Sequence, residues 1–331
     1  FWRVEPHWVD ILDAPLFPTL AERAPVEDEP FVHPYAAFNV ALARAARASG
    51  ARVMFTGLGG DHLFHVELSY LADLLRRGRL GSFARELRAQ PARNAELFRE
   101  FVVRPLLGPG ARAVVGRLRG AHPRGYLEPV IPDWIRPDFA ERAGLREREA
   151  SLVARRPGED AAAYEKRWML THPFFARTIG ATRQIALDSG LEQRAPLYDS
   201  RVVTFAAARP RAERHAGRET KRLLRAAVRG LLPDAVLAPR AHKTGTMGDY
   251  FGRAIQTEFP KIASELFRAP LLAELGIVDA KRLWQAGARV ERNVPESSVA
   301  ELVFTLEVEL WLRARAATPS HSIRPQAAGV Q

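Results

Sequence analysis

The feature that most constrains the fold is a short apolar segment followed directly by a glycine-rich turn. Residues 52–55 (Arg-Val-Met-Phe) have the β-branched and aromatic content of a buried strand. The turn Thr56-Gly57-Leu58-Gly59-Gly60-Asp61 follows, and apolar residues at helical spacing predict a helix over 62–77. A second helical pattern over 34–49 ends at Gly50, just before the strand. Helix, strand, glycine turn and helix in this order predict an α/β unit.

The chemistry of this turn allows two interpretations. Three glycines at the carboxyl end of a strand let the backbone approach a ligand, and their N–H groups form an anion-binding nest with the next helix. Asp61 in such a nest suits Mg²⁺ beside phosphates. A structural alternative is a tight strand-to-helix turn with Asp61 as the helix N-cap. The turn matches neither a P-loop nor a dinucleotide fingerprint, so it leaves both interpretations open.

Two later segments carry further candidate residues. Residues 190–199 (GLEQRAPLYD) predict a fixed corner, with a Glu/Arg pair two positions apart and Asp199 as the N-cap of a helix. Only five of the 49 basic residues are lysine, so Lys221 and Lys243 stand out. Lys243 lies in a loop bounded by proline and glycine, where a flexible ammonium can neutralise negative charge that develops on a phosphate or an oxyanion. A structural ion pair and solvated lysines are the alternatives.

The remaining pattern is mostly helical. The segment 161–187 predicts one long helix with an interruption near Pro173, and 82–120 is helical with breaks at its prolines and glycines. A short strand is predicted at 1–4, and further helices are predicted at 199–208, 220–231, 250–269 and 298–316.

Composition excludes several classes of protein. The chain has no cysteine, which excludes disulfides, thiolate metal sites and a cysteine nucleophile. It also has no apolar run of the ~18–20 residues that a membrane span needs. The net charge of +11 invites a nucleic-acid interpretation. However, the arginines gathered over 73–124 lack the aromatic-glycine pattern of an RNA-binding sheet, so we expect neither nucleic acid nor membrane as a partner. By charge alone, this segment suits an acidic or extended peptide.

Taken in order, these segments resemble the synthetase domain of the glutamine-hydrolysing asparagine synthetase family. Residues 56–64 (TGLGGDHLF) resemble the family's Ser-Gly-Glu-Gly-Ser/Ala-Asp-Glu-Leu/Val-Phe loop. Residues 190–199 are similar to its Gly-Val-Glu-x-Arg-x-Pro-Phe-Leu-Asp segment, and 217–233 resemble its Gly-x-x-x-Lys-x-x-Leu-Arg…Leu-Pro segment. The loop of Lys243 follows, so the resemblance covers roughly residues 28–255.

The resemblance implies an α/β fold of the adenine nucleotide α-hydrolase (HUP), or PP-loop ATP-pyrophosphatase, type. We expect a synthetase-type domain over 1–317, with a parallel α/β part at about 1–77 and a large, mostly helical part at about 78–317. We expect 318–331 to be a disordered tail. The implied activity is that of a cytoplasmic ligase that uses ATP and Mg²⁺ to adenylate a carboxylate, after which an amine attacks the acyl-adenylate to form an amide.

The resemblance also assigns roles to individual residues. Asp61 is the implied ligand of Mg²⁺ and pyrophosphate, Lys221 a phosphate-binding residue, and Lys243 the group that stabilises the adenylate and the tetrahedral intermediate. The backbone implied to lie near the nucleotide is that of Thr56, Gly57, Leu58, Gly59 and Gly60.

Three departures from the family pattern qualify these roles. The Ser-Gly-Gly-x-Asp-Ser pyrophosphate loop is not in the sequence, so we expect an N-terminally incomplete domain whose site is completed by a further segment or a partner chain. Without cysteine the chain cannot release ammonia from glutamine. Leu58 replaces a family glutamate, which points from asparagine synthase toward β-lactam synthetases and lasso-peptide cyclases. The alternatives are an inactive family member acting as a binding module and an Arg-rich nucleic-acid-binding protein.

Overall fold

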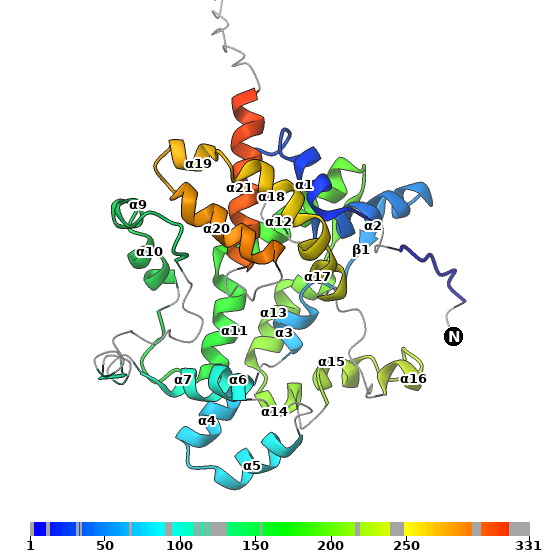
Figure 1. The fold of residues 1–331 in the computed structure, drawn as a ribbon. Coiled ribbons are helices and arrows are strands. Elements are labelled where there is room, and N and C mark those ends of the chain that lie inside the picture. The colour runs from blue at the N-terminus through cyan, green and yellow to red at the C-terminus, as the bar shows by residue number, and fades with distance from the viewer. Residues whose placement is uncertain are drawn as a thin grey trace, which may run out of the picture. The chain divides into compact units, whose positions relative to one another are not determined.

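Helices dominate the structure, a computed structural model, and the described strands are only β1 (Val53–Phe55) and β2 (Glu192–Arg194) (Figure 1). The chain forms two compact units, each built from three separate stretches of sequence. The first unit takes residues 1–9, 42–130 and 143–246, and the second takes 10–41, 131–142 and 247–331. The structure describes residues 3–10, 14–30, 33, 35–65, 68–89, 95–108, 111, 114, 115, 118, 131–152, 154–215, 219–238, 248–292 and 299–317.

The sheet of the first unit is parallel. Val53 pairs with Glu192 and Phe55 with Arg194. The ladder extends past the strands at both ends, since the N–H of Glu192 donates to the carbonyl of Arg52 at 2.8 Å and the N–H of Thr56 to the carbonyl of Arg194 at 2.9 Å. The sequence predicted β1 but not β2, whose residues were interpreted as a corner. A strand of three residues with two charged side chains gives too little pattern to detect.

The helices next to this sheet agree in part with the sequence. The predicted interruption near Pro173 is confirmed, because α11 (Ala161–Thr171) ends there and α12 (Pro173–Asp188) begins. His172 caps α12 through its Nδ1, which accepts from the N–H of Phe174 at 3.2 Å. The single helix predicted over 62–77 is wrong, because the backbone of His65 is extended and separates α3 (Gly60–Phe64) from α4 (Tyr70–Arg76).

Two apolar clusters hold the first unit together. Leu63 and Phe64 of α3 pack with Ala206 of α13 (Ser200–Ala208), and Tyr70 and Leu71 of α4 lie in a separate cluster with other helices. The other described helices of this unit are α5 (Leu80–Ala89), α6 (Ala95–Phe98), η1 (Arg99–Val103), α7 (Arg104–Leu106), α10 (Leu145–Leu152), η2 (Pro196–Tyr198), α14 (Arg211–Arg214), α15 (Arg222–Ala227) and α16 (Asp234–Leu237).

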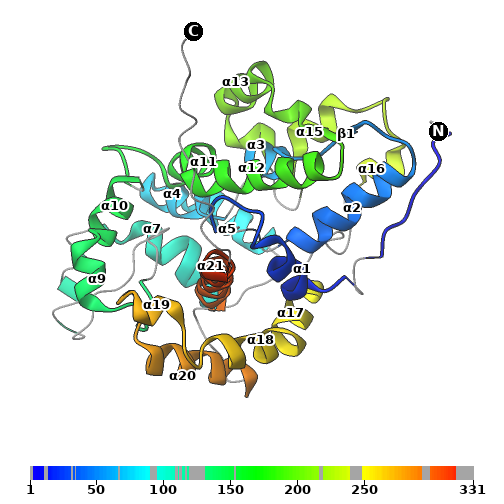
Figure 2. The ribbon, with the colours of Figure 1, turned by 90° about the horizontal axis from the view of Figure 1, so that it is seen from above.

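The second unit is organised around α21 (Val299–Ala317). Figure 2 shows α21 end-on, and its side chains Leu302 and Leu306 are fully buried. The helices in contact with it are α1 (Leu16–Arg23), α18 (Phe259–Leu266), α19 (Leu271–Glu274) and α20 (Ala280–Glu291). α9 (Pro137–Arg142) and α17 (Gly248–Thr257) complete the unit, and α2 (Ala36–Ala48) begins in it and continues into the first.

Three further expectations need correction. Residues 3–10 form no strand, so the strand predicted at 1–4 is absent from its described half. The helix predicted over 250–269 is two helices, α17 and α18, because Pro260 is suited to a helix start rather than to a helix interior. The helix predicted over 220–231 is the shorter α15. Within the described residues, no helix has the length and apolarity needed to cross a membrane.

Candidate functional site

The glycine turn lies directly after β1 and leads into α3. Gly59 has φ +95°, and a Cβ at this position would lie 3.1 Å from the Cβ of Leu197. Both the left-handed conformation and the close approach therefore require glycine. Apart from its chain neighbours, no atom of the described residues lies within 4 Å of the place a Cβ on Gly57 would occupy, so the backbone is open to a ligand there.

Asp61 does not act as the N-cap of α3. The capping position is Gly59, and Asp61 lies in the first turn of the helix without a capping hydrogen bond. Its side chain is 76% exposed, and its Oδ1 lies 2.9 Å from the Nζ of Lys221. The structure thus pairs two residues that the sequence singled out in separate segments, and it removes the capping alternative for Asp61.

The pKa of Asp61 reflects this pairing. Burial acts to raise the pKa of the carboxyl, but the hydrogen bond and charge of Lys221, with smaller contributions from His65 and His62, lower the pKa below its ordinary value. The carboxylate is therefore charged across the neutral range and available to a cation.

Lys221 is held in an unusual backbone conformation. Its φ of 52° and ψ of 34° lie in the left-handed region. Among the described non-glycine residues, Arg3 is the only other one with a positive φ. Arg225 stabilises this turn, because its guanidinium donates to the carbonyls of Thr220 at 3.0 Å and Leu237 at 2.8 Å. Strain of this kind gathers at functional sites.

The sequence did not single out His62 and Tyr198, which also contribute to the site. The Nδ1 of His62 shares a hydrogen bond with the hydroxyl of Tyr198, and the His62 ring lies edge-on to Phe175 at 5.1 Å between centroids. Burial lowers the pKa of His62, although the charge of Asp61 opposes this, and burial raises the pKa of Tyr198. Both residues are thus held neutral. Their only sequence signal is that they lie inside the two segments already noted.

Several predicted residues have structural roles. Glu192 and Arg194 form a two-bond ion pair at 2.8 and 3.1 Å on the exposed side of β2. Asp199 caps α13, as predicted, by accepting the N–H of Arg201 at 2.9 Å. The structural interpretation of this corner is therefore confirmed.

The predicted site residues that the structure describes lie together. Thr56 follows β1, and its Oγ1 is buried with no hydrogen-bond partner among the described residues. The segment Thr56–Gly60, Asp61 and Lys221 form one cluster, whereas Lys243 lies outside the described residues. No group of three or more metal-ligating side chains occurs in the described ranges. A single exposed carboxylate nevertheless fits Mg²⁺, which usually keeps several waters and takes its other ligands from substrate phosphates.

Comparison with known proteins gives one family. The family model described as asparagine synthase matches residues 4–313 of the chain. No curated protein matches it.

Proposed function

Because the chain belongs to the asparagine synthase family, we propose that it is an ATP-dependent ligase that joins a carboxylate to an amine. The carboxylate attacks the α-phosphorus of ATP and displaces pyrophosphate, and the amine then displaces AMP from the acyl-adenylate to form the amide. The proposal includes an α/β nucleotide-binding fold of the adenine nucleotide α-hydrolase type. The ion pair between Asp61 and Lys221 carries the proposal, because it places a carboxylate and an ammonium beside a glycine turn.

The turn has the properties expected of a phosphate-binding segment. It lies at the carboxyl end of a parallel strand, where α/β proteins bind their ligands. The backbone at Gly57 is open there, and the buried Oγ1 of Thr56 next to it has no hydrogen-bond partner among the described residues. The Nζ of Lys221 lies 3.9 Å from the place a Cβ on Gly60 would occupy, so its charge is next to the turn.

Each charged residue has a separate proposed role. Asp61 would hold Mg²⁺, which when bound neutralises charge on the phosphates. Lys221 neutralises Asp61 in the described pair and would bind a phosphate oxygen of the nucleotide. Lys243 would stabilise the negative charge that develops on the adenylate and the tetrahedral intermediate.

Leu58 bears on the choice of substrates. Its side chain can neither accept a proton nor bind an amine, whereas asparagine synthetases carry a glutamate at the matching position. We therefore favour a cyclase that uses an amine of its own peptide or small-molecule substrate, with asparagine synthase itself as the other member of the same reaction class.

Exchange of labelled pyrophosphate into ATP tests the first step. The full-length gene product is assayed with a panel of carboxylates, and Asp61→Asn, Lys221→Gln and Lys243→Ala are each expected to lower exchange about 100-fold. Lys261→Gln removes an exposed lysine of α18 in the second unit and is the matched control, with exchange unchanged. Folding of each variant is checked by circular dichroism. Wild-type exchange in folded Asp61→Asn and Lys221→Gln would show that the proposed roles are wrong.

A further inference from the structure

A second polar feature of the first unit is a small pocket beside the glycine-turn helix. It lies between α3, α11 and α14, and its empty space is about 300 Å³ with the open mouth included. Its wall is formed by His62, His65, Ala162, Glu165, Lys166, Met169 and Arg214.

Arg214 is the unusual member of this wall. The residue is only 5% exposed, yet within the described residues it forms no ion pair with a carboxylate. Its Nη1 donates to the carbonyl of Leu63 at a long 3.4 Å, and its Nε has no hydrogen-bond partner in the described part of the chain. Buried charges in proteins are ordinarily paired, and the charge of Glu165 acts on this guanidinium without forming an ion pair of normal distance with it in the described part of the chain.

Lys166 adds a second cation to the same wall. Its Nζ donates to the carbonyl of Ala207 at 2.6 Å, which uses one of the three ammonium hydrogens. Burial lowers the pKa of Lys166, and the charge of Arg214 lowers it further, so the two cations interact. Glu165 is the one carboxylate on the wall, and it accepts a hydrogen bond from the hydroxyl of Ser69. One carboxylate does not balance two cations.

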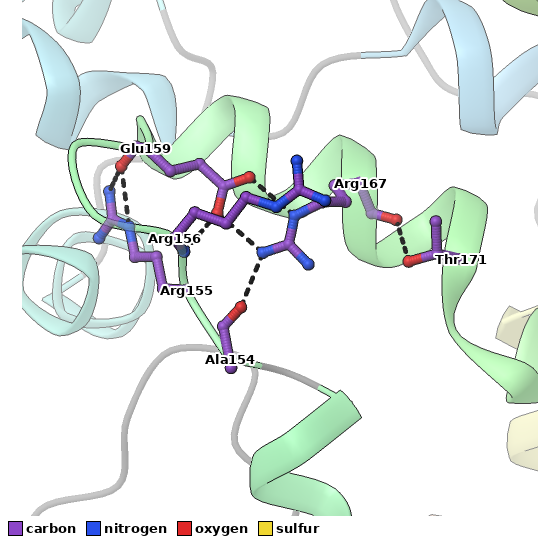
Figure 3. Close-up of polar contacts among 6 residues, drawn as sticks. All are labelled: Ala154, Arg155, Arg156, Glu159, Arg167 and Thr171. Atoms are coloured by element: carbon purple, nitrogen blue, oxygen red, sulfur yellow. Dashed lines mark hydrogen bonds and ion pairs between the residues drawn. The ribbon is translucent and has the colours of Figure 1, made fainter.

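The helix that carries Lys166 is fixed at its start. The carboxylate of Glu159 accepts two hydrogen bonds from Arg167, both 2.8 Å long, and Arg155 donates to the carbonyl of Glu159. Figure 3 shows these contacts. The carboxylate of Asp73 in α4 accepts the N–H groups of Ala161 and Ala162 at 2.7 and 3.0 Å. A helix anchored in this way holds its charged side chains in place before any ligand arrives.

We propose that this pocket binds a small oxyanion, a carboxylate or a phosphate group, between Arg214 and Lys166. The guanidinium offers a fork of donors that matches either group, and the ammonium adds a point charge. The pocket shares His62 with the candidate site but is lined by neither Asp61 nor Lys221. The proposal goes beyond the ligase activity because binding needs neither ATP nor turnover.

Isothermal titration of the full-length gene product tests the pocket without a reaction. Sodium phosphate and sodium acetate are titrated separately at one pH and one ionic strength, with no nucleotide present. We expect saturable binding of at least one anion, and the tighter of the two identifies the group that the pocket takes. Arg214→Gln is expected to weaken that binding about tenfold or more, the effect of losing one charge-assisted hydrogen bond.

The controls separate the pocket from general charge. Arg209→Gln removes the same charge from a half-exposed arginine that pairs with Glu213 outside the pocket, and binding should stay within twofold of the wild type. Lys166→Gln should weaken anion binding as Arg214→Gln does. If Arg214→Gln does not fold, the affinity of Lys166→Gln alone tests the proposal. Absence of saturable binding, or equal affinity in the pocket variants and the wild type, would overturn the proposal.

Discussion

At the scale of single residues, Lys221 combines a strained backbone with a proposed function. Its left-handed conformation costs a residue with a Cβ about 1 kcal/mol, whereas glycine adopts it freely. Its ion pair with the largely exposed Asp61 contributes little to the free energy of unfolding. The ion pair therefore does not offset the strain, which is the pattern expected where a side chain is kept for binding.

Two substitutions separate strain from function at this residue. Lys221→Ala and Lys221→Gly both remove the ammonium, but only glycine relieves the left-handed strain. We expect Lys221→Gly to be more stable than Lys221→Ala by about 1 kcal/mol in urea unfolding, with pyrophosphate exchange equally low in both. Equal stability of the two variants would show that the turn is not strained at this residue.

The sequence predicted some residues of the site and not others. The glycine turn was recognisable because three glycines after a strand are a local signal, and Asp199 was recognisable because a cap immediately precedes its helix. The hydrogen bond between His62 and Tyr198 joins residues 136 positions apart, and no local pattern encodes such a pair. The pairing of Lys221 with Asp61 could not be predicted for the same reason.

At the scale of elements, the start of α11 depends on a residue outside the helix. Asp160 occupies the N-cap position but makes no capping hydrogen bond. Asp73 of α4 binds the first two N–H groups in its place. Burial acts to raise the pKa of Asp73, and its net pKa stays above the ordinary value even though these two N–H groups oppose the rise.

Removal of this contact should destabilise the first unit. We expect Asp73→Ala to lower the free energy of unfolding by about 2 kcal/mol, because two helix-start N–H groups lose their partner in a buried place. Asp160→Ala is the matched control, since it removes only an exposed ion pair with Arg77 and should cost less than about 0.5 kcal/mol. Chemical denaturation of both variants measures the difference, and similar losses would contradict the assignment.

Helix α21 carries two buried glutamates that differ in their hydrogen bonds. Glu309 accepts the N–H groups of Leu271 and Leu272 at 2.9 and 3.1 Å and pairs with Arg313. Neither carboxyl oxygen of Glu307 has a hydrogen-bond partner of normal geometry among the described residues. Burial raises the pKa of Glu307 well above its ordinary value, and the nearby N–H of His33 opposes this only in part.

This contrast predicts a pH dependence. Above pH 4.5 an unfolded chain releases the proton of Glu307 while the folded chain retains it, so stability falls as the pH rises toward the folded pKa. Glu307→Gln removes this loss, and its stability relative to the wild type should grow by up to about 1.4 kcal/mol per pH unit above 4.5. Glu309→Gln should destabilise the protein across the neutral range. Urea unfolding of each variant from pH 4.5 to 8 measures both effects, and a constant difference for Glu307→Gln would refute the first.

His33, in the same unit, lowers the stability of the folded protein at acid pH. Burial, with a smaller effect of Arg23, lowers the pKa of His33 to about 4. An unfolded chain takes up this proton near pH 6.5 and the folded chain only near 4, so stability falls as the pH drops between these values. The Glu307→Gln variant should keep this acid-side loss, which serves as an internal control.

Elements were predictable where a local breaker marks them. Pro173 divides α11 from α12 because proline cannot continue a helix that needs its N–H, and the sequence shows this directly. The strand β2 has three residues and gains its identity only by pairing with β1, so its local pattern could not predict it. The break between α3 and α4 could not be predicted either, because no proline or glycine lies between Phe64 and Tyr70 in the sequence.

At the scale of the whole molecule, each compact unit is assembled from three stretches that alternate along the chain. Each unit has buried side chains of its own, such as Leu63 and Tyr70 in the first and Leu283 and Leu302 in the second. Local periodicity predicts helices within a stretch, but it cannot tell which stretches return to a shared core. The boundary expected near residue 77 between an α/β part and a helical part stays a prediction.

Two compact units predict separate local stabilities. Hydrogen exchange of amides reports opening free energies along the chain, and regions of one core tend to open together. In Asp73→Ala we expect faster exchange in α4 and α11, with protection unchanged in α18, α20 and α21. Glu309→Ala should give the reverse, because its contacts with α19 and Arg313 all lie in the second unit. Loss of protection in both units from either substitution would instead show that the molecule unfolds as one cooperative body.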